Sequence, residues 1–230
     1  NIDFSCHKGQ KIAVIGSTGS GKSTLVKLMN RFYDVSRGSI EINGVDIRKY
    51  DLESLRAQVG YVAQKAHMFK GSIRSNICFG KPEASDEEMH HAARVAQASD
   101  FISKRENGYL DEIAEDGTNI SGGQKQRLSI ARVILKKPSL YIYDDSFSAL
   151  DFKTDATLRK ALKPEVKDAI FFVVAQRIST IMDSDMIIVL DEGQIIGLGT
   201  HLELLKNCSV YQEIAHSQLT QKELDDYERN

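Results

Sequence analysis

The chain contains 230 residues with a formal net charge of -2, and 27% of its residues are charged. This length fits one compound domain with a sizeable core, and the charge balance gives no basic surface that would indicate a nucleic-acid partner. Cys6, Cys78 and Cys208 are widely spaced and match neither a disulfide framework nor a zinc site, so we interpret them as reduced thiols.

No apolar run approaches the roughly 20 residues that a helix needs to cross a bilayer, and the N-terminus lacks the pattern of a signal peptide. We therefore expect the chain itself to be soluble. It begins at Asn1 without a methionine, and its first strand-like segment follows almost at once. We expect it to be part of a longer polypeptide.

The first expected unit is a strand, a glycine-rich turn and a helix. The β-branched segment QKIAVIG (10–16) ends in glycine, and KSTLVKLMNRF (22–32) follows with apolar residues at helical spacing. The next segment, GSIEINGVDI (38–47), alternates apolar residues around Asn43-Gly44, which is a strong signal for a two-residue hairpin. A small antiparallel piece is therefore predicted beside the first αβ unit.

The middle of the chain, about residues 81–137, is predicted to be an α-helical subdomain. Its first helix has an acidic first turn after Ser85, and SGGQKQRLSIARVILKKP (121–138) places its apolar residues on one face before a proline. The remaining chain alternates apolar strands with helices, which indicates a mostly parallel sheet covered on both faces. The predicted fold is therefore α/β, with a P-loop NTPase core formed by about 1–80 and 138–216 and a polar tail over 217–230.

A phosphate-binding loop is predicted between the first strand and the first helix. GSTGSGKST (16–24) fits the pattern G-x-x-x-x-G-K-[ST]. The glycines let backbone N–H groups converge on phosphate oxygens, the lysine adds a positive charge, and the serine hydroxyl can bind Mg²⁺. This site predicts binding of a nucleoside triphosphate with Mg²⁺. The expected nucleotide-contacting residues are Ser17, Thr18, Gly19, Ser20, Gly21, Lys22, Ser23 and Thr24.

The segment LYIYDDS (140–146) ends an apolar strand on two adjacent carboxylates. A strand lying beside the strand of the phosphate-binding loop would deliver Asp144 close to Ser23, where it can hold Mg²⁺ through water.

A second phosphate-ready helix terminus is predicted at ISGGQKQRLSIAR (120–132). Ser121 is placed as the N-cap, and Gly122 and Gly123 expose backbone N–H groups. Because one terminal phosphate does not need two such sites from one chain, we interpret Ser121 to Gln124 as serving a nucleotide bound to another subunit.

These motifs resemble those of the nucleotide-binding domain of ATP-binding cassette (ABC) transporters of the exporter type. The resemblance covers nearly the whole chain, and AHMFKGSIRSNICFG (66–80) is similar to the exporter stretch that meets the coupling helices of a transmembrane domain. IAEDG (113–117) looks like the exporter X-loop, with Glu115 at its acidic position. The remaining motifs are Walker A (16–24), the Q-loop YVAQ with Gln64, the signature (120–124), Walker B (140–144) and the D-loop SALD (148–151).

The resemblance implies that two such domains close head to tail around two ATP molecules, each site combining the Walker motifs of one domain with the signature of the other. The signature residues Ser121, Gly122, Gly123 and Gln124 then contact the partner's ATP. Ser23, Gln64 and Asp144 are the residues expected at Mg²⁺. The transmembrane domains lie outside this chain, and the expected location is the cytoplasmic face of the cell membrane, as part of a transporter.

Two positions depart from the family pattern. A glutamate usually follows the Walker B aspartate and polarises the attacking water, but here that residue is Asp145, whose side chain is shorter by roughly 1.5 Å, one C–C bond. The family also places a histidine where this chain has Gln176. Glutamine can donate a hydrogen bond to phosphate, but it carries no positive charge and shuttles no proton.

Both catalytic positions, Asp145 and Gln176, are changed while the binding residues remain, which resembles the degenerate subunit of heterodimeric exporters. We therefore hypothesise that this chain binds ATP, hydrolyses it slowly by itself, and completes the site of a non-identical partner. The alternatives are a catalytically competent homodimeric ABC ATPase, a regulatory nucleotide-gated binding module, and a soluble ABC ATPase of DNA repair or translation.

A further departure concerns the adenine base. The family stacks adenine on an aromatic residue about two dozen positions before the Walker A loop, whereas only residues 1–15 precede it here. Phe4 and His7 are too close to the loop to be that residue. We expect the adenine platform to lie upstream of Asn1.

Overall fold

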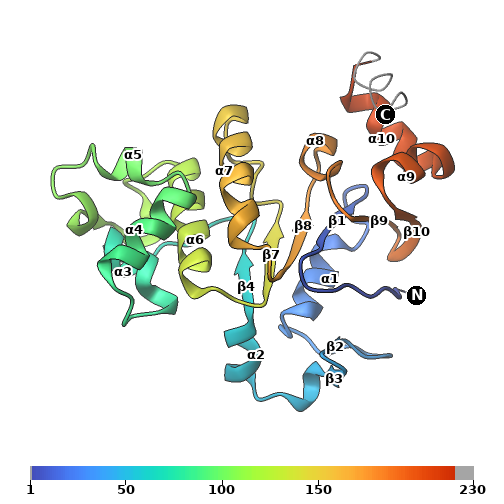
Figure 1. The fold of residues 1–230 in the computed structure, drawn as a ribbon, viewed down its shortest axis with the longest axis horizontal. Helices are drawn as coiled ribbons and strands as arrows, with labels where there is room; N and C mark the ends of the chain where they lie inside the picture. The colour runs from blue at the N-terminus through green and yellow to red at the C-terminus, as the bar shows by residue number, and fades with distance from the viewer. Residues whose placement is uncertain (1, 221–230) are drawn as a thin grey trace.

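One six-stranded sheet forms the centre of the molecule (Figure 1). The computed structural model describes residues 2–220. In spatial order the strands are β10 (Gln194–Gly199), β9 (Met186–Asp191), β1 (Lys11–Ile15), β8 (Ile170–Val174), β7 (Leu140–Asp144) and β4 (Val59–Val62). All neighbours pair in parallel except β10, which is antiparallel to β9. The prediction of a mostly parallel sheet is confirmed.

Helices cover both faces of this sheet, because successive strand residues point to opposite sides. Ile12 and Val14 of β1 pack in one core with α1 (Lys22–Met29) and α2 (Leu52–Gln58), whereas Ala13 and Ile15 pack in the other. The helices that share the second core include α6 (Gly122–Lys136), α7 (Phe152–Glu165), α8 (Ile178–Ile181) and α10 (Ser209–Gln218). Burial on both faces explains why these strands are almost continuously apolar.

The hairpin predicted at Asn43-Gly44 is present. Strands β2 (Glu41–Ile42) and β3 (Val45–Asp46) pair antiparallel, and Asn43 and Gly44 have φ values of 53° and 74°. Positive φ at both central residues is the requirement of a type I′ turn, which asparagine and glycine meet at little cost. A 3₁₀ turn (Ile47–Lys49) follows the hairpin.

A helical region lies beside the β4 edge of the sheet (Figure 1). Besides α6 it contains α3 (Ile73–Ile77), α4 (Asp86–Val95) and α5 (Ser99–Ile102), with 3₁₀ turns at Cys78–Gly80, Gly108–Leu110 and Glu115–Gly117 and a short ladder of β5 (Gly71–Ser72) and β6 (Glu112–Ile113). Ser85 caps α4 through a capping box with Glu88. The long helical pattern after Ser85 is interrupted at Gln97, whose φ is 57°.

The described part of the chain ends on two helices: α9 (His201–Asn207), which packs against β10, and α10, which packs against α9. Of the predicted tail over 217–230, residues 217 and 218 belong to the end of α10, and residues 221–230 lie outside the described residues. Within residues 2–220, no helix combines the length and apolar character needed to cross a membrane.

Candidate functional site

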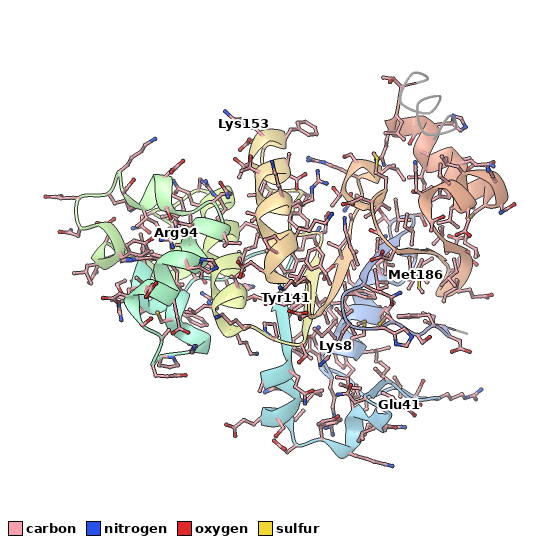
Figure 2. The ribbon with its side chains drawn as sticks, in the orientation of Figure 1. Lys8, Glu41, Arg94, Tyr141, Lys153 and Met186 are labelled. Atoms are coloured by element: carbon pink, nitrogen blue, oxygen red, sulfur yellow. The ribbon has the colours of Figure 1, made fainter. Side chains whose placement is uncertain are left out.

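The carboxyl ends of three parallel strands meet at one edge of the sheet and carry the predicted site residues. The expectation that the strand of Asp144 lies directly beside the strand of the phosphate-binding loop is wrong, because β8 lies between β1 and β7. The residues still converge, since parallel neighbours end at the same edge and two inter-strand spacings of about 4.8 Å are easily bridged by side chains. Figure 2 shows Tyr141 of β7 in the middle of the molecule, between Arg94 in the helical region and Met186 at the start of β9.

The phosphate-binding loop follows β1 and is held tightly against the strand ends. A Cβ atom on Gly16 would lie 2.1 Å from the carbonyl oxygen of Leu190, so only glycine fits there. The Gly193 N–H donates to the Ser20 carbonyl at 3.0 Å, and Ser20 is 2% exposed. Gly21 is the N-cap of α1 with φ 103° and provides no side-chain cap. No side chain therefore caps the first backbone N–H groups of α1. They remain available to an anion, which the positive end of the helix dipole also attracts.

Lys22 folds its side chain back over this loop. Its Nζ donates to the carbonyl oxygens of Gly16 and Ser17 at 2.8 and 2.6 Å, and to Ser20 Oγ at 3.3 Å. Burial lowers the pKa of Lys22, while the charges of Asp145 and Asp144 oppose that shift. The loop therefore holds the ammonium group at the carboxyl ends of the strands, where both carboxylates also lie. The next two residues, Ser23 and Thr24, are exposed.

Asp145 is hydrogen-bonded to two of the other predicted site residues, Gln64 and Gln176. Its Oδ2 accepts hydrogen bonds from Gln64 Nε2 at 3.0 Å and from Gln176 Nε2 at 2.8 Å. The backbone of Asp145 is in the left-handed region with φ 48°, a conformation that non-glycine residues seldom adopt and that clusters at functional sites. Its N–H donates to the Val174 carbonyl at 2.9 Å, which ties the turn to β8.

Asp144 has a partner that the sequence analysis missed. The Tyr61 hydroxyl donates to Asp144 Oδ2 at 3.2 Å, and Phe32 packs edge-on against the Tyr61 ring with centroids 5.6 Å apart. The available signal was the position of Tyr61 in β4, three residues before Gln64 in the same motif. Because β4 pairs with β7 in parallel, this tyrosine and Asp144 reach the same sheet edge.

The two adjacent carboxylates lie in a poorly solvated position. Asp144 and Asp145 are only 6% and 8% exposed. Burial raises the pKa of both groups, and the charge of Asp145 adds to the shift at Asp144. Hydrogen bonds from Tyr61 to Asp144 and from Gln64 to Asp145 act in the opposite direction. Two ionised carboxylates in such a position favour a cation nearby.

We predict that Asp144→Asn stabilises the nucleotide-free chain at pH 7, by on the order of 1 kcal/mol or about 2–4 °C in Tm. Because burial raises the pKa of Asp144, its protonated form favours the fold. That contribution is complete below the unfolded pKa of about 4 and is lost as the pH rises through the folded pKa. Asparagine is neutral throughout, so the difference in Tm should vanish at low pH.

Calorimetric melting of both proteins from about pH 3 to pH 8, which brackets the unfolded pKa, measures this difference. Asp168→Asn is the matched control, because its carboxylate is highly exposed and its removal should leave Tm nearly unchanged. A lower Tm for Asp144→Asn at pH 7 would show that the fold needs the carboxylate.

The donor set at this edge suits Mg²⁺ together with phosphate. A hydroxyl from Ser23, an amide from Gln64 and a carboxylate from Asp144 are hard oxygen ligands. Among residues 2–220, no group of three or more His, Cys, Asp or Glu side chains could hold a metal ion by itself. A magnesium ion here would therefore share substrate phosphates, as is usual for this metal.

The second glycine-rich helix terminus has the predicted N-cap. Ser121 and Gln124 form a capping box, in which Gln124 N donates to Ser121 Oγ at 3.3 Å and Ser121 N donates to Gln124 Oε1 at 3.0 Å. The side chain of Gln124 is thus used within the cap. A Cβ on Gly122 would meet nothing within 4 Å. This terminus belongs to α6, which packs over β4, whereas the phosphate-binding loop follows β1 (Figure 1).

Comparisons with known proteins place this geometry in a family. The family model described as ABC transporter matches residues 1–148. The chain is 46% identical over 214 residues to the putative multidrug export ATP-binding/permease protein YgaD of Bacillus subtilis (strain 168), covering 93% of this chain and 37% of that protein. It is 43% identical over 222 residues to heavy metal tolerance factor 1 of Caenorhabditis elegans, covering 96% of this chain and 28% of that protein.

A solved structure is similar over most of the chain. A bacterial Atm1-family ABC exporter with ATP bound superposes with a TM-score of 0.90 at 39% identity, covering 93% of this chain and 38% of that one. The chain thus spans less than two-fifths of each of these relatives. The family model, the sequence identity to relatives and the structural similarity all agree with the motifs. The chain therefore belongs to the ABC transporter family, in which it is an ATPase domain of the exporter type.

Proposed function

We propose that this chain binds MgATP and closes head to tail with a second, non-identical nucleotide-binding domain, while its own site hydrolyses ATP slowly. The observation that carries the proposal is the pair Asp145 and Gln176. Their side chains stand where the family has a glutamate and a histidine, and they are hydrogen-bonded to each other at 2.8 Å. The residues for binding are retained around a site whose two catalytic positions are changed.

The binding residues act through charge and backbone donors. Lys22 and the uncapped amides of α1 would hold the phosphates, and Ser23, Gln64 and Asp144 would hold Mg²⁺. When bound, MgATP supplies a phosphoanhydride bond whose hydrolysis can be coupled to movement of the transporter. Ser17 to Thr24 form the cradle, and Ser121 to Gln124 would serve the nucleotide of the partner.

Asp145 is badly placed for the work of a general base. A base must come within hydrogen-bond reach, about 2.6–3.2 Å, of the water it activates. The side chain is one methylene shorter than glutamate, and its Oδ2 already accepts two amide hydrogen bonds. Burial raises the pKa of this carboxyl and the bond from Gln64 opposes that shift, so acidity is not what weakens the base. The short reach and the two hydrogen bonds already accepted support slow intrinsic hydrolysis.

We extend the proposal to the membrane-embedded partner. The 66–80 segment carries Phe69 and Phe79, which stack at a centroid distance of 4.2 Å while remaining 45% and 57% exposed. Arg132 lies over both rings. This exposed aromatic pair supports docking of a transmembrane domain, and the export functions named for the relatives fit a location at the cytoplasmic face of the membrane.

Gly122→Ala tests the role of the signature. We predict that it lowers turnover at the partner's site about tenfold or more, because a methyl group would intrude where a phosphate must approach the backbone. The fold should tolerate the change: the Cβ meets nothing within 4 Å, and alanine is the better helix former. Phosphate release by the assembled transporter is the measurement, and the variant's Tm and own ATP affinity are internal controls.

The outcomes of this experiment separate the candidate functions. Loss of turnover with unchanged ATP binding supports a signature that works in trans. Unchanged turnover would contradict the proposal. Rapid hydrolysis by the isolated chain, abolished by Asp145→Asn, would instead support a homodimeric ATPase with two competent sites.

A further inference from the structure

The loop that carries Gln176 is anchored by a residue from the far end of the chain. Helix α8 begins after Arg177, which provides no side-chain cap, so the N–H of Ile178 needs an acceptor from elsewhere. Gln218 supplies it: its Oε1 accepts from Ile178 N at 2.8 Å, and its Nε2 donates to the Gln176 carbonyl at 2.7 Å. One side-chain amide therefore caps α8 and holds the preceding loop at the same time.

This double hydrogen bond restrains both peptide groups that flank Arg177. An amide that donates to one peptide and accepts from the next leaves little freedom for the intervening backbone. The Arg177 guanidinium lies over the Phe152 ring at 4.8 Å, which holds the loop from the side of α7. The orientation of the Gln176 side chain toward Asp145 thus depends on contacts from two other helices.

Gln218 can act as an anchor because its helix is firmly placed. Tyr211 and Ala215 of α10 are fully buried, and α10 packs against α8. Gln218 is the last residue of this helix, one turn beyond Ala215. A rigid helix thus presents the amide to the loop, so the loop position is set by the packing of α10 as well as by local sequence.

We propose that Gln218 is a positioning residue for this chain's nucleotide site: it holds the loop 175–178 so that Gln176 points at Asp145 and at the terminal phosphate position. The role at phosphate rests on the proposed function. The anchoring itself concerns only residues of this chain and can be measured separately.

The experiment compares three variants in the full transporter after the partner's own hydrolytic site has been inactivated by mutation, so that turnover reports this chain's slow site. Gln218→Met keeps the side-chain length and removes both hydrogen bonds, and Gln218→Glu at neutral pH keeps an acceptor but loses the donor to the Gln176 carbonyl. Gln212→Met is the matched control. Gln212 lies on the same helix, but its Nε2 donates to the Leu205 carbonyl of α9 at 2.6 Å and not to the loop that carries Gln176.

We expect both Gln218 variants to lower kcat of this chain's site on the order of tenfold while KM for ATP stays within about twofold, because the Gln176 amide is no longer held toward the terminal phosphate and ground-state binding is unchanged. Gln212→Met should change neither constant. In a Gln176→Ala background the effect of Gln218→Met on kcat should disappear, since residues that act through one another are not additive. Hydrogen exchange at the Ile178 amide should accelerate in Gln218→Met and remain slow in Gln212→Met.

Each contrary result has a distinct meaning. Unchanged kcat in Gln218→Met, or equal losses in the presence and absence of Gln176, would overturn the positioning role while leaving the proposed function intact. Unchanged exchange at Ile178 would overturn the anchor itself. Absence of MgATP binding by the wild-type site would instead overturn the proposed function, and the exchange measurement would still report on the anchor.

Discussion

Lys22→Ala is expected to weaken MgATP binding by this chain on the order of 100-fold, equivalent to about 3 kcal/mol for a charge-assisted contact to phosphate. The structure holds the ammonium within the loop by three hydrogen bonds, to Gly16, Ser17 and Ser20. Removing it deletes the positive charge and leaves the two loop carbonyls without their donor. Titration with a fluorescent ATP analogue in the presence of Mg²⁺ measures the change.

Lys8→Ala is the control for loss of one positive charge. Lys8 is exposed and precedes β1, at the opposite end of the strand from the phosphate-binding loop (Figure 2). We expect this variant to bind MgATP like the wild type. Equal affinities of Lys22→Ala and wild type would show that the nucleotide does not use this loop.

The double change Asp145→Glu with Gln176→His is expected to raise the rate of ATP hydrolysis at this chain's own site, on the order of 100-fold. Glutamate extends the carboxylate by roughly 1.5 Å toward the reacting water. The second change replaces the Gln176 amide that donates to Asp145 Oδ2 at 2.8 Å with an imidazole, which can carry charge. Phosphate release by the assembled transporter, with the partner's own hydrolytic site inactivated by mutation, is the measurement.

Asp144→Glu tests whether carboxylate length alone matters. It lengthens the neighbouring acid, which the structure pairs with Tyr61, and it should lower turnover because it displaces a residue proposed to hold Mg²⁺. An increase with Asp144→Glu, or no increase with the double change, would contradict the assignment of Asp145 as the shortened general base.

Local sequence was sufficient for features whose cause is local. The Asn43-Gly44 turn, the N-cap at Ser121, and the strand, loop and helix around Lys22 all appear where expected. Each depends on residues a few positions apart, whose φ preferences and hydrogen-bonding groups act within one turn. The parallel sheet was also predictable, because burial on both faces leaves a continuous apolar pattern.

The sequence by itself therefore determined the elements, the loop chemistry and the motif order that identify the family. Only the tertiary structure decided which strands are neighbours and which side chains meet: β8 lies between β1 and β7, Tyr61 reaches Asp144, and Gln218 holds the loop of Gln176. These contacts join residues far apart in the chain, so they depend on strand order, register and helix packing, which no local pattern specifies.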